Sequence, residues 1–179
     1  GCGYVGLELA RQLTPDHEVI GVRRSTLDAV RETGARAVEA DVTDADALAE
    51  LPDVDALVFA ASSGGRGAEA AREVYVEGLE TAIDAFADRE SPPDQLVYTS
   101  STGVYGDHDG DWVDESTPIE PTTEKTAVLA EAERIATEYA AERGIDGTVA
   151  RFAGLYGPDR YRLDRYLEGP GPAGDLTMV

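Results

Sequence analysis

The first six residues place three glycines in a spacing that can hold a pyrophosphate. Gly1, Gly3 and Gly6 form the pattern G-x-G-x-x-G, with Tyr4 and Val5 between them, and the pattern runs directly into a segment of helical periodicity. The glycines allow a tight turn and close approach of the backbone to a phosphate, and the helix N-terminus favours negative charge. An ordinary glycine-rich turn has the same composition, and the strand that normally precedes this motif is not in the sequence.

Two adjacent arginines, Arg23 and Arg24, follow a short apolar run that is typical of a buried strand. In a Rossmann fold, the end of the second strand contacts the adenosine ribose. NAD sites usually carry Asp or Glu there, whereas guanidinium groups make bidentate contacts to a 2′-phosphate. The arginine pair therefore predicts NADP as the cofactor, with NAD possible, and a solvated arginine pair is the alternative.

Five further residues at expected strand ends complete the predicted nucleotide site. Asp41 and Val42 end the third strand of that fold, and we expect Asp41 to face the adenine amino group. Ala60, Ala61 and Ser62 end the next apolar run and are expected to line the ribose and nicotinamide side. The carboxyl ends of parallel strands meet at one edge of a sheet, so these residues should lie together.

The elements that must position these residues alternate between strand and helix patterns. Strand-type runs cover residues 18–22, 37–42, 56–61, 95–100 and 147–152, and helical periodicity marks 7–13, 27–33, 46–51, 68–88 and 128–139. This order predicts an α/β fold, a doubly wound parallel sheet of Rossmann type that is truncated at both ends. We expect residues 1–158 to form an NAD(P)-binding domain without its first strand, and 159–179 to begin a C-terminal substrate region.

Two longer segments carry a resemblance to a known family. Residues 99–106 (TSSTGVYG) and 151–158 (RFAGLYGP) closely resemble the extended short-chain dehydrogenase/reductases, the NAD(P)-dependent epimerase/dehydratase family. With the glycine turn and the Asp41-Val42 pair, the resemblance covers essentially the whole chain in order. It implies a Rossmann domain for the cofactor, a smaller C-terminal region for a substrate, often a nucleotide sugar, and hydride transfer to or from a carbonyl or alcohol carbon.

The family uses a Ser or Thr, a Tyr and a Lys, and this sequence departs from that pattern. The resemblance places Ser101, four residues before Tyr105, as the serine that bonds the reacting oxygen; a strand-end serine satisfied by backbone is the alternative. A Tyr-x-x-x-Lys pair is absent, because the only lysine is Lys125 and the residue four before it is Pro121. Alignment puts Lys125 at the tyrosine position and Leu129 at the lysine position.

The chain therefore resembles an atypical family member. Lys125 could replace the base only if it were desolvated, and a solvated residue at the helix start is the alternative. Tyr105 could reach the nicotinamide pocket, or it packs under its loop. Two functions stay open: an NAD(P)-dependent oxidoreductase or epimerase/dehydratase-like enzyme in which an unidentified group moves the proton, and a non-catalytic NADP-binding sensor or regulatory protein.

Charge excludes other classes of function. The 36 acidic and 15 basic residues give a formal net charge of -21, which argues against binding to nucleic acid or to an anionic membrane. One cysteine and two histidines make a metal site unexpected. A carboxylate-rich, lysine-poor composition resembles that of cytosolic proteins of salt-loving microbes, so we expect a cytoplasmic location. The expected partner is a small-molecule substrate, and the two long helices make a homodimer possible.

Overall fold

The computed structural model describes residues 1–64, 67–158 and 160, and it has five parallel strands in that part of the chain. The predicted C-terminal substrate region, 159–179, lies outside the described residues except for Arg160. The elements in chain order are α1 (Tyr4–Leu13), β1 (Ile20–Arg23), α2 (Asp28–Arg31), β2 (Arg36–Glu39), α3 (Ala45–Ala49), β3 (Ala56–Phe59), α4 (Ala68–Arg72), the π-helical turn η1 (Glu73–Glu77), α5 (Gly78–Ala87), β4 (Gln95–Ser101), the 3₁₀ turn η2 (Thr102–Tyr105), α6 (Glu124–Arg134), the π-helical turn η3 (Ile135–Tyr139), α7 (Ala140–Glu142) and β5 (Asp146–Phe152).

The strands confirm the predicted parallel α/β architecture but form two sheets. One sheet pairs β1 with β2, and the other has the order β3-β4-β5. Within the described residues no strand lies between β1 and β3 and pairs with both. The edge of the smaller sheet at β1 and the edge of the larger sheet at β3 are therefore separated by a gap. This is the gap expected from a Rossmann order that lacks its first strand.

The glycine turn occupies the carboxyl end of that gap. The backbone N–H of Cys2 donates to the carbonyl oxygen of Val22 at 2.9 Å, which attaches the turn to β1. On its other side Gly1 packs against Ala61, the second residue beyond β3, so closely that a Cβ on Gly1 would lie 2.5 Å from the Cα of Ala61. The turn therefore touches the end of each sheet.

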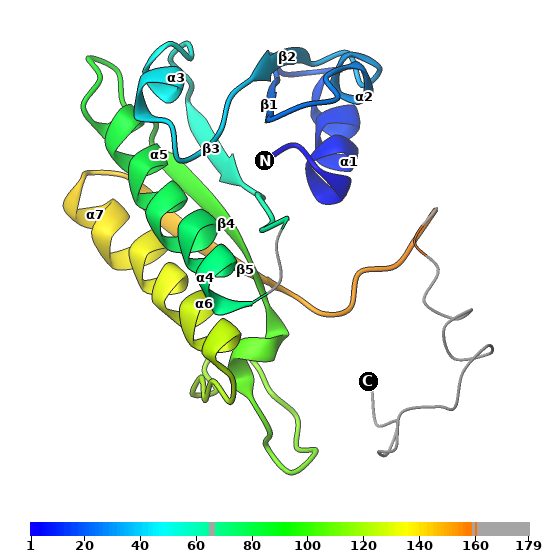
Figure 1. Cartoon of the computed structure of the whole chain (residues 1–179), viewed down its shortest axis with the longest axis vertical. Coiled ribbons are helices and arrows are strands. Elements are labelled where there is room, and N and C mark those ends of the chain that lie inside the picture. Colours follow the sequence, from blue (N-terminus) through cyan, green and yellow to red (C-terminus); the bar gives the residue numbers. More distant parts are fainter. Residues whose placement is uncertain (65–66, 159, 161–179) are drawn as a thin grey trace.

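Two long helices cover one face of the larger sheet (Figure 1). One runs from α4 through η1 to α5, and the other from α6 through η3 to α7. Their apolar faces pack on β4 and β5, and the fully buried side chains there include Leu79, Ile83, Leu96, Tyr98 and Ile145. No helix in the described part of the chain is both long and apolar enough to cross a membrane. The homodimer expected from the two long helices stays a prediction.

Several boundaries differ from the sequence prediction for local reasons. The second long helix begins at Glu124, not at residue 128, because the side chains of Thr123 and Thr126 form a reciprocal capping box. The strand expected over 37–42 ends at Glu39, because an Asx turn from Asp41 to the Thr43 N–H redirects the backbone. Asp41 and Val42 consequently lie beyond the strand, at the edge where a ligand can reach them.

Close packing of η3 on β5 depends on a missing side chain. A Cβ on Gly147 would lie 1.7 Å from the carbonyl oxygen of Ala136, so only glycine allows the helix backbone to approach the strand this closely. The long helix reaches the sheet at this point through its backbone, not through an apolar side chain.

Replacement of that glycine should therefore destabilise the fold. We expect Gly147→Ala to lower the free energy of unfolding by about 1–3 kcal/mol, because the helix or strand must shift to relieve the overlap. Gly103→Ala is the matched control, since its Cβ would meet its nearest neighbours, the Ser101 Oγ and Thr126 Cγ2, at 3.5 Å and 3.6 Å. Urea denaturation measures both variants, and equal stability of the two would contradict the packing argument.

Candidate functional site

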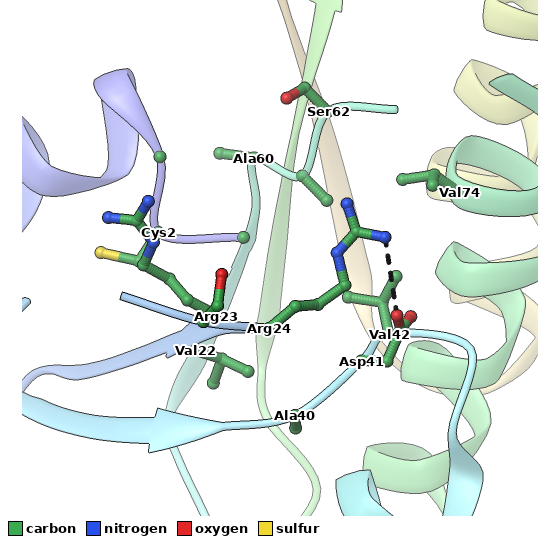
Figure 2. A pocket seen from close by; sticks show the side chains of 14 residues that line it. Cys2, Val22, Arg23, Arg24, Ala40, Asp41, Val42, Ala60, Ser62 and Val74 are labelled. Atoms are coloured by element: carbon green, nitrogen blue, oxygen red, sulfur yellow. Dashed lines mark ion pairs between the residues drawn. The ribbon is translucent and has the colours of Figure 1, made fainter. Parts of the chain in front are cut away.

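A cavity of about 200 Å³ lies at the carboxyl ends of β1, β2 and β3, where the two sheets face each other (Figure 2). Most of the predicted nucleotide-binding residues line it: Gly1, Gly3, Arg23, Arg24, Asp41, Val42, Ala60, Ala61 and Ser62. Sequence reasoning missed the remaining lining residues: Cys2, Val22, Ser25, Ala40 and Val74. Most of these are apolar or small residues next to predicted ones, and only their place in the fold distinguishes them.

The glycine turn presents an open helix N-terminus to this cavity. Gly3 is the N-cap of α1, and no side chain caps the helix or places a carboxylate in its first turn. The N–H groups of that turn have no acceptor within the helix, and they carry the positive end of the helix dipole. A Cβ on Gly3 would meet nothing within 4 Å, which leaves the backbone accessible, whereas a Cβ on Gly6 would lie 3.0 Å from the Gly1 carbonyl oxygen.

Tyr4, Val5 and Gly6 do not line the cavity, although the motif includes them. The Tyr4 hydroxyl donates to the Pro158 carbonyl oxygen at 3.4 Å, and the Arg160 guanidinium stacks over the Tyr4 ring at 5.2 Å. The start of α1 thus contacts the segment that follows β5. A role for these three residues in cofactor binding stays a prediction.

Arg23 and Arg24, the two arginines predicted to bind the cofactor, point to different parts of the site. Figure 2 shows Arg23 directed toward Cys2 and Arg24 directed toward Asp41. Successive residues of an extended chain face opposite sides, which separates their guanidinium groups. The Nη1 of Arg24 lies 3.7 Å from the Oδ2 of Asp41, whereas Arg23 has no ion pair among the described residues.

Asp41 is held in place by the turn that follows it. Its Oδ1 accepts hydrogen bonds from the backbone N–H of Thr43 at 3.1 Å and from the Thr43 hydroxyl at 2.9 Å. The backbone hydrogen bond from Thr43, helped by the Thr43 hydroxyl and by Arg24, lowers the pKa of the Asp41 carboxyl below its ordinary value. The group is therefore an anion at neutral pH.

The far wall of the cavity comes from the first long helix. Val74, in the π-helical turn η1, lines the cavity, and the neighbouring Tyr75 accepts a hydrogen bond from the Ser63 N–H at 3.2 Å. A Cβ on Gly78 would lie 2.6 Å from the Cγ2 of Val42, so glycine lets the helix close on this wall. A π-helical turn has no sequence signature, and for that reason Val74 and Tyr75 were not predicted here.

Ser101 lies outside the cavity, at the end of β4. Its Oγ accepts a hydrogen bond from the Gly103 N–H at 3.2 Å and caps the turn η2. The Ser101 oxygen is thus bonded to the backbone, as in a strand-end serine without a catalytic role, but its hydroxyl hydrogen stays available for another acceptor. A catalytic role for Ser101 stays a prediction.

Tyr105 and Lys125 also lie outside the cavity. The buried Tyr105 hydroxyl donates to the Asp114 carbonyl oxygen at 2.8 Å and accepts from the Arg151 Nη1 at 2.8 Å. Tyr105 thus packs under its loop, the alternative to a place in the nicotinamide pocket. Lys125 is exposed near the start of α6 and has no ion pair among the described residues, so the structure places it as a solvated residue.

A buried polar contact joins Arg151 on β5 to Glu133 on α6. Glu133 is only 5% exposed, and its carboxylate accepts from the Nε of Arg151 at 3.0 Å and from the Nη2 at 2.8 Å. Hydrogen bonding to Glu133 raises the pKa of the Arg151 guanidinium above its ordinary value. The contact joins α6 to the end of β5 and, through Tyr105, to the loop around Asp114.

We expect Glu133→Gln to lower the free energy of unfolding by about 1.5–3 kcal/mol, because it removes charged hydrogen bonds from a buried site. The control is Glu131→Gln, a change on the same helix as Glu133. It removes the carboxylate of the half-exposed ion pair between Glu131 and Arg72 of α4. That change should cost about 0–1 kcal/mol, since exposed ion pairs contribute little. Urea denaturation compares the two variants, and similar losses would show that burial of the Arg151 pair is energetically unimportant.

The reactivity of the Cys2 thiol, which lines the cavity, can report whether the cavity is occupied. Burial raises the pKa of the Cys2 thiol, although the charge of Arg23 opposes this, so the reactive thiolate is scarce at neutral pH. We expect slow alkylation by iodoacetamide that accelerates as the pH rises and slows when a nucleotide occupies the cavity. Mass spectrometry follows the rate, with Cys2→Ser/Ser91→Cys as the exposed reference. Equal alkylation rates in wild type and in the Cys2→Ser/Ser91→Cys variant would contradict the placement of Cys2 in a buried cavity wall.

Comparisons with known proteins give matches that cover most of the chain. The profile of the NAD dependent epimerase/dehydratase family matches residues 1–167. "Protein YeeZ" of Escherichia coli (strain K12) is 30% identical over 185 residues, which cover 98% of this chain and 64% of that protein. UDP-glucose 4-epimerase of Corynebacterium glutamicum is 30% identical over 167 residues, covering 88% of this chain and 51% of that protein.

Solved structures show the same similarity. A double mutant of DesIV, a dTDP-glucose 4,6-dehydratase from Streptomyces venezuelae with bound NAD, aligns with a TM-score of 0.76 and 30% identity over 91% of this chain and 56% of that one. A conserved protein of unknown function from Silicibacter pomeroyi aligns with a TM-score of 0.66 and 32% identity over 96% and 56%. The chain thus spans about half to two thirds of these relatives. It belongs to the NAD-dependent epimerase/dehydratase family.

Proposed function

We propose that the protein binds a nicotinamide dinucleotide at the cavity between the glycine turn and the ends of β1, β2 and β3, with NADP preferred over NAD. The observation that carries this proposal is the Arg23-Arg24 pair at the end of β1, on the cavity wall. The two guanidinium groups lie on different parts of the cavity wall, and either can make a charge-assisted contact to a 2′-phosphate. The end of β1 has no carboxylate of its own to accept from a 2′-hydroxyl.

The cavity fits the adenosine part of such a ligand. Its volume of about 200 Å³ is smaller than a whole dinucleotide needs, so we place only the 2′-phosphoadenosine portion in it. The open first turn of α1 offers N–H groups to the pyrophosphate. Ala61 and Ser62 then lead toward the end of β4, the strand that pairs with β3 and carries Ser101.

We further propose that the protein takes part in hydride exchange with a carbonyl or alcohol carbon of a small molecule of the nucleotide-sugar class. Family membership supports this, as do relatives named as an epimerase and a dehydratase of nucleotide sugars. A bound cofactor would supply the hydride chemistry, and the Ser101 hydroxyl would orient the reacting oxygen. The Tyr105 hydroxyl already has an acceptor in Asp114 and a donor in Arg151, and we propose that a group other than Tyr105 moves the proton.

A second function, a non-catalytic NADP sensor, is favoured by the same contacts. The sequence has no Tyr-x-x-x-Lys pair. The hydroxyl of Tyr105 already donates to the Asp114 carbonyl oxygen and accepts from Arg151. A chain of this kind would keep the nucleotide site and have no group to transfer the proton.

Titration with NADPH and NADH in molar salt, followed by nicotinamide fluorescence, tests the cofactor proposal. We expect tighter binding of NADPH, and a loss of about ten- to a hundred-fold for Arg23→Ala or Arg24→Ala, because each removes a charge-assisted contact. NADH binding should change little in these variants. Arg31→Ala, which removes an exposed arginine paired with Asp28, is the control. Absence of binding by either cofactor would overturn both proposed functions.

Turnover separates the enzyme from the sensor. NADPH oxidation and NADP reduction are followed with a panel of aldehydes, alcohols and nucleotide sugars, using wild type and Ser101→Ala. Turnover that falls in Ser101→Ala with unchanged NADPH affinity supports the enzyme. Tight cofactor binding without any hydride transfer overturns the enzyme and supports the sensor.

A further inference from the structure

Arg24 is already paired with an anion of the protein. Its Nη1 lies 3.7 Å from the Oδ2 of Asp41, and the two side chains are 57% and 39% exposed. Its Nη2 lies on the other side against Gly64, where a Cβ would be only 3.2 Å away. The guanidinium therefore lies across the cavity, between the loop after β2 and the loop after β3 (Figure 2).

The carboxylate that faces Arg24 is not free to move away. Thr43 holds its other oxygen through a backbone N–H and a hydroxyl, at 3.1 Å and 2.9 Å. A phosphate that binds Arg24 must share the guanidinium with this fixed anion, and two anions on one cation repel each other. In a chain with a formal net charge of -21, few cations are available to offset that repulsion.

We propose that Asp41 is a specificity-determining residue, whose carboxylate competes with the nucleotide 2′-phosphate for Arg24 and so limits the preference for NADP over NAD. This inference rests on the proposed NADP site. Arg23 has no ion pair among the described residues and supplies a constant attraction for the phosphate. Arg24 supplies an attraction whose strength Asp41 sets.

Competition of Asp41 for Arg24 can be distinguished by measurement from the contact of Asp41 with the adenine amino group that the sequence predicts. A carboxylate that only bonds adenine would strengthen the binding of all adenine nucleotides, with or without a 2′-phosphate. A carboxylate that competes for Arg24 weakens only the nucleotides that carry the 2′-phosphate. The ratio of two affinities, for adenosine 2′,5′-bisphosphate and for AMP, therefore separates the two roles.

The test measures that ratio by calorimetry on the full chain in buffered salt. We expect Asp41→Asn to raise the affinity for adenosine 2′,5′-bisphosphate relative to AMP by about two- to five-fold, the range of a half-exposed ion pair. Asp41→Ala should act in the same direction and guards against an effect particular to the amide. Asp46→Asn removes one exposed carboxylate from the adjacent helix α3 and measures the general effect of charge.

Arg24→Ala supplies the decisive comparison. In that background the change produced by Asp41→Asn should fall to the level of Asp46→Asn, because the cation for which the two anions compete is gone. An unchanged ratio in Asp41→Asn, or the same increase with and without Arg24, would overturn the inference while leaving the NADP site intact. If wild type binds neither nucleotide, the proposed function itself fails, and the competition fails with it.

Discussion

One backbone hydrogen bond, from the Cys2 N–H to the Val22 carbonyl oxygen, attaches the glycine turn to the strand end that carries Arg23. Since β1 and β3 are not paired with each other, this bond and the contact of Gly1 with Ala61 are what place the glycine turn at the ends of both sheets. A parallel sheet puts the carboxyl ends of its strands at one edge, and the turn closes that edge. The helix N-terminus, the arginine pair and Asp41 face one cavity as a result.

A second constraint operates at the same carboxyl end of the larger sheet, on β5, the strand farthest from β3. The Glu133–Arg151 pair, with Tyr105 hydrogen-bonded to Arg151, joins α6, β5 and the loop around Asp114 into one network. A buried ion pair is tolerated when its remaining hydrogen bonds are satisfied, as they are here. The network holds Tyr105 away from the nucleotide cavity. The chain therefore combines a cavity lined by most of the predicted cofactor-binding residues with Ser101, for which the sequence has no Tyr-x-x-x-Lys pair.

Charge connects the site to the rest of the molecule. A formal net charge of -21 produces a field that opposes the approach of phosphates, and salt screens this field over roughly 10 Å at 0.1 M ionic strength. Arg23 and Arg24 act locally against it, within contact distance of a ligand. A pair of arginines in so acidic a chain therefore has more effect at the cavity than the overall charge balance indicates. Asp41 moderates that effect because Thr43 holds it beside Arg24.

Local sequence was sufficient for the fold class and for most of the cavity. Alternating apolar runs predicted the parallel strands, and the strand-end positions of Arg23, Asp41 and Ser62 predicted that they meet. These features depend on periodicity and chain direction, which a single sequence contains. Boundaries were less accurate, because caps and turns such as that of Thr123 depend on side-chain hydrogen bonds of one or two residues.

Only the tertiary structure decided how the site residues are used. The separation of Arg23 from Arg24 and the pairing of Arg24 with Asp41 depend on how β1 and the loop after β2 lie in space. The contributions of Val74 and Tyr75 depend on a π-helical turn, and the place of Tyr105 on an arginine distant in sequence. Sequence determined which residues come to the carboxyl edge, whereas their contacts follow from long-range packing, because hydrogen bonds and ion pairs form between atoms that the chain brings together only when it folds.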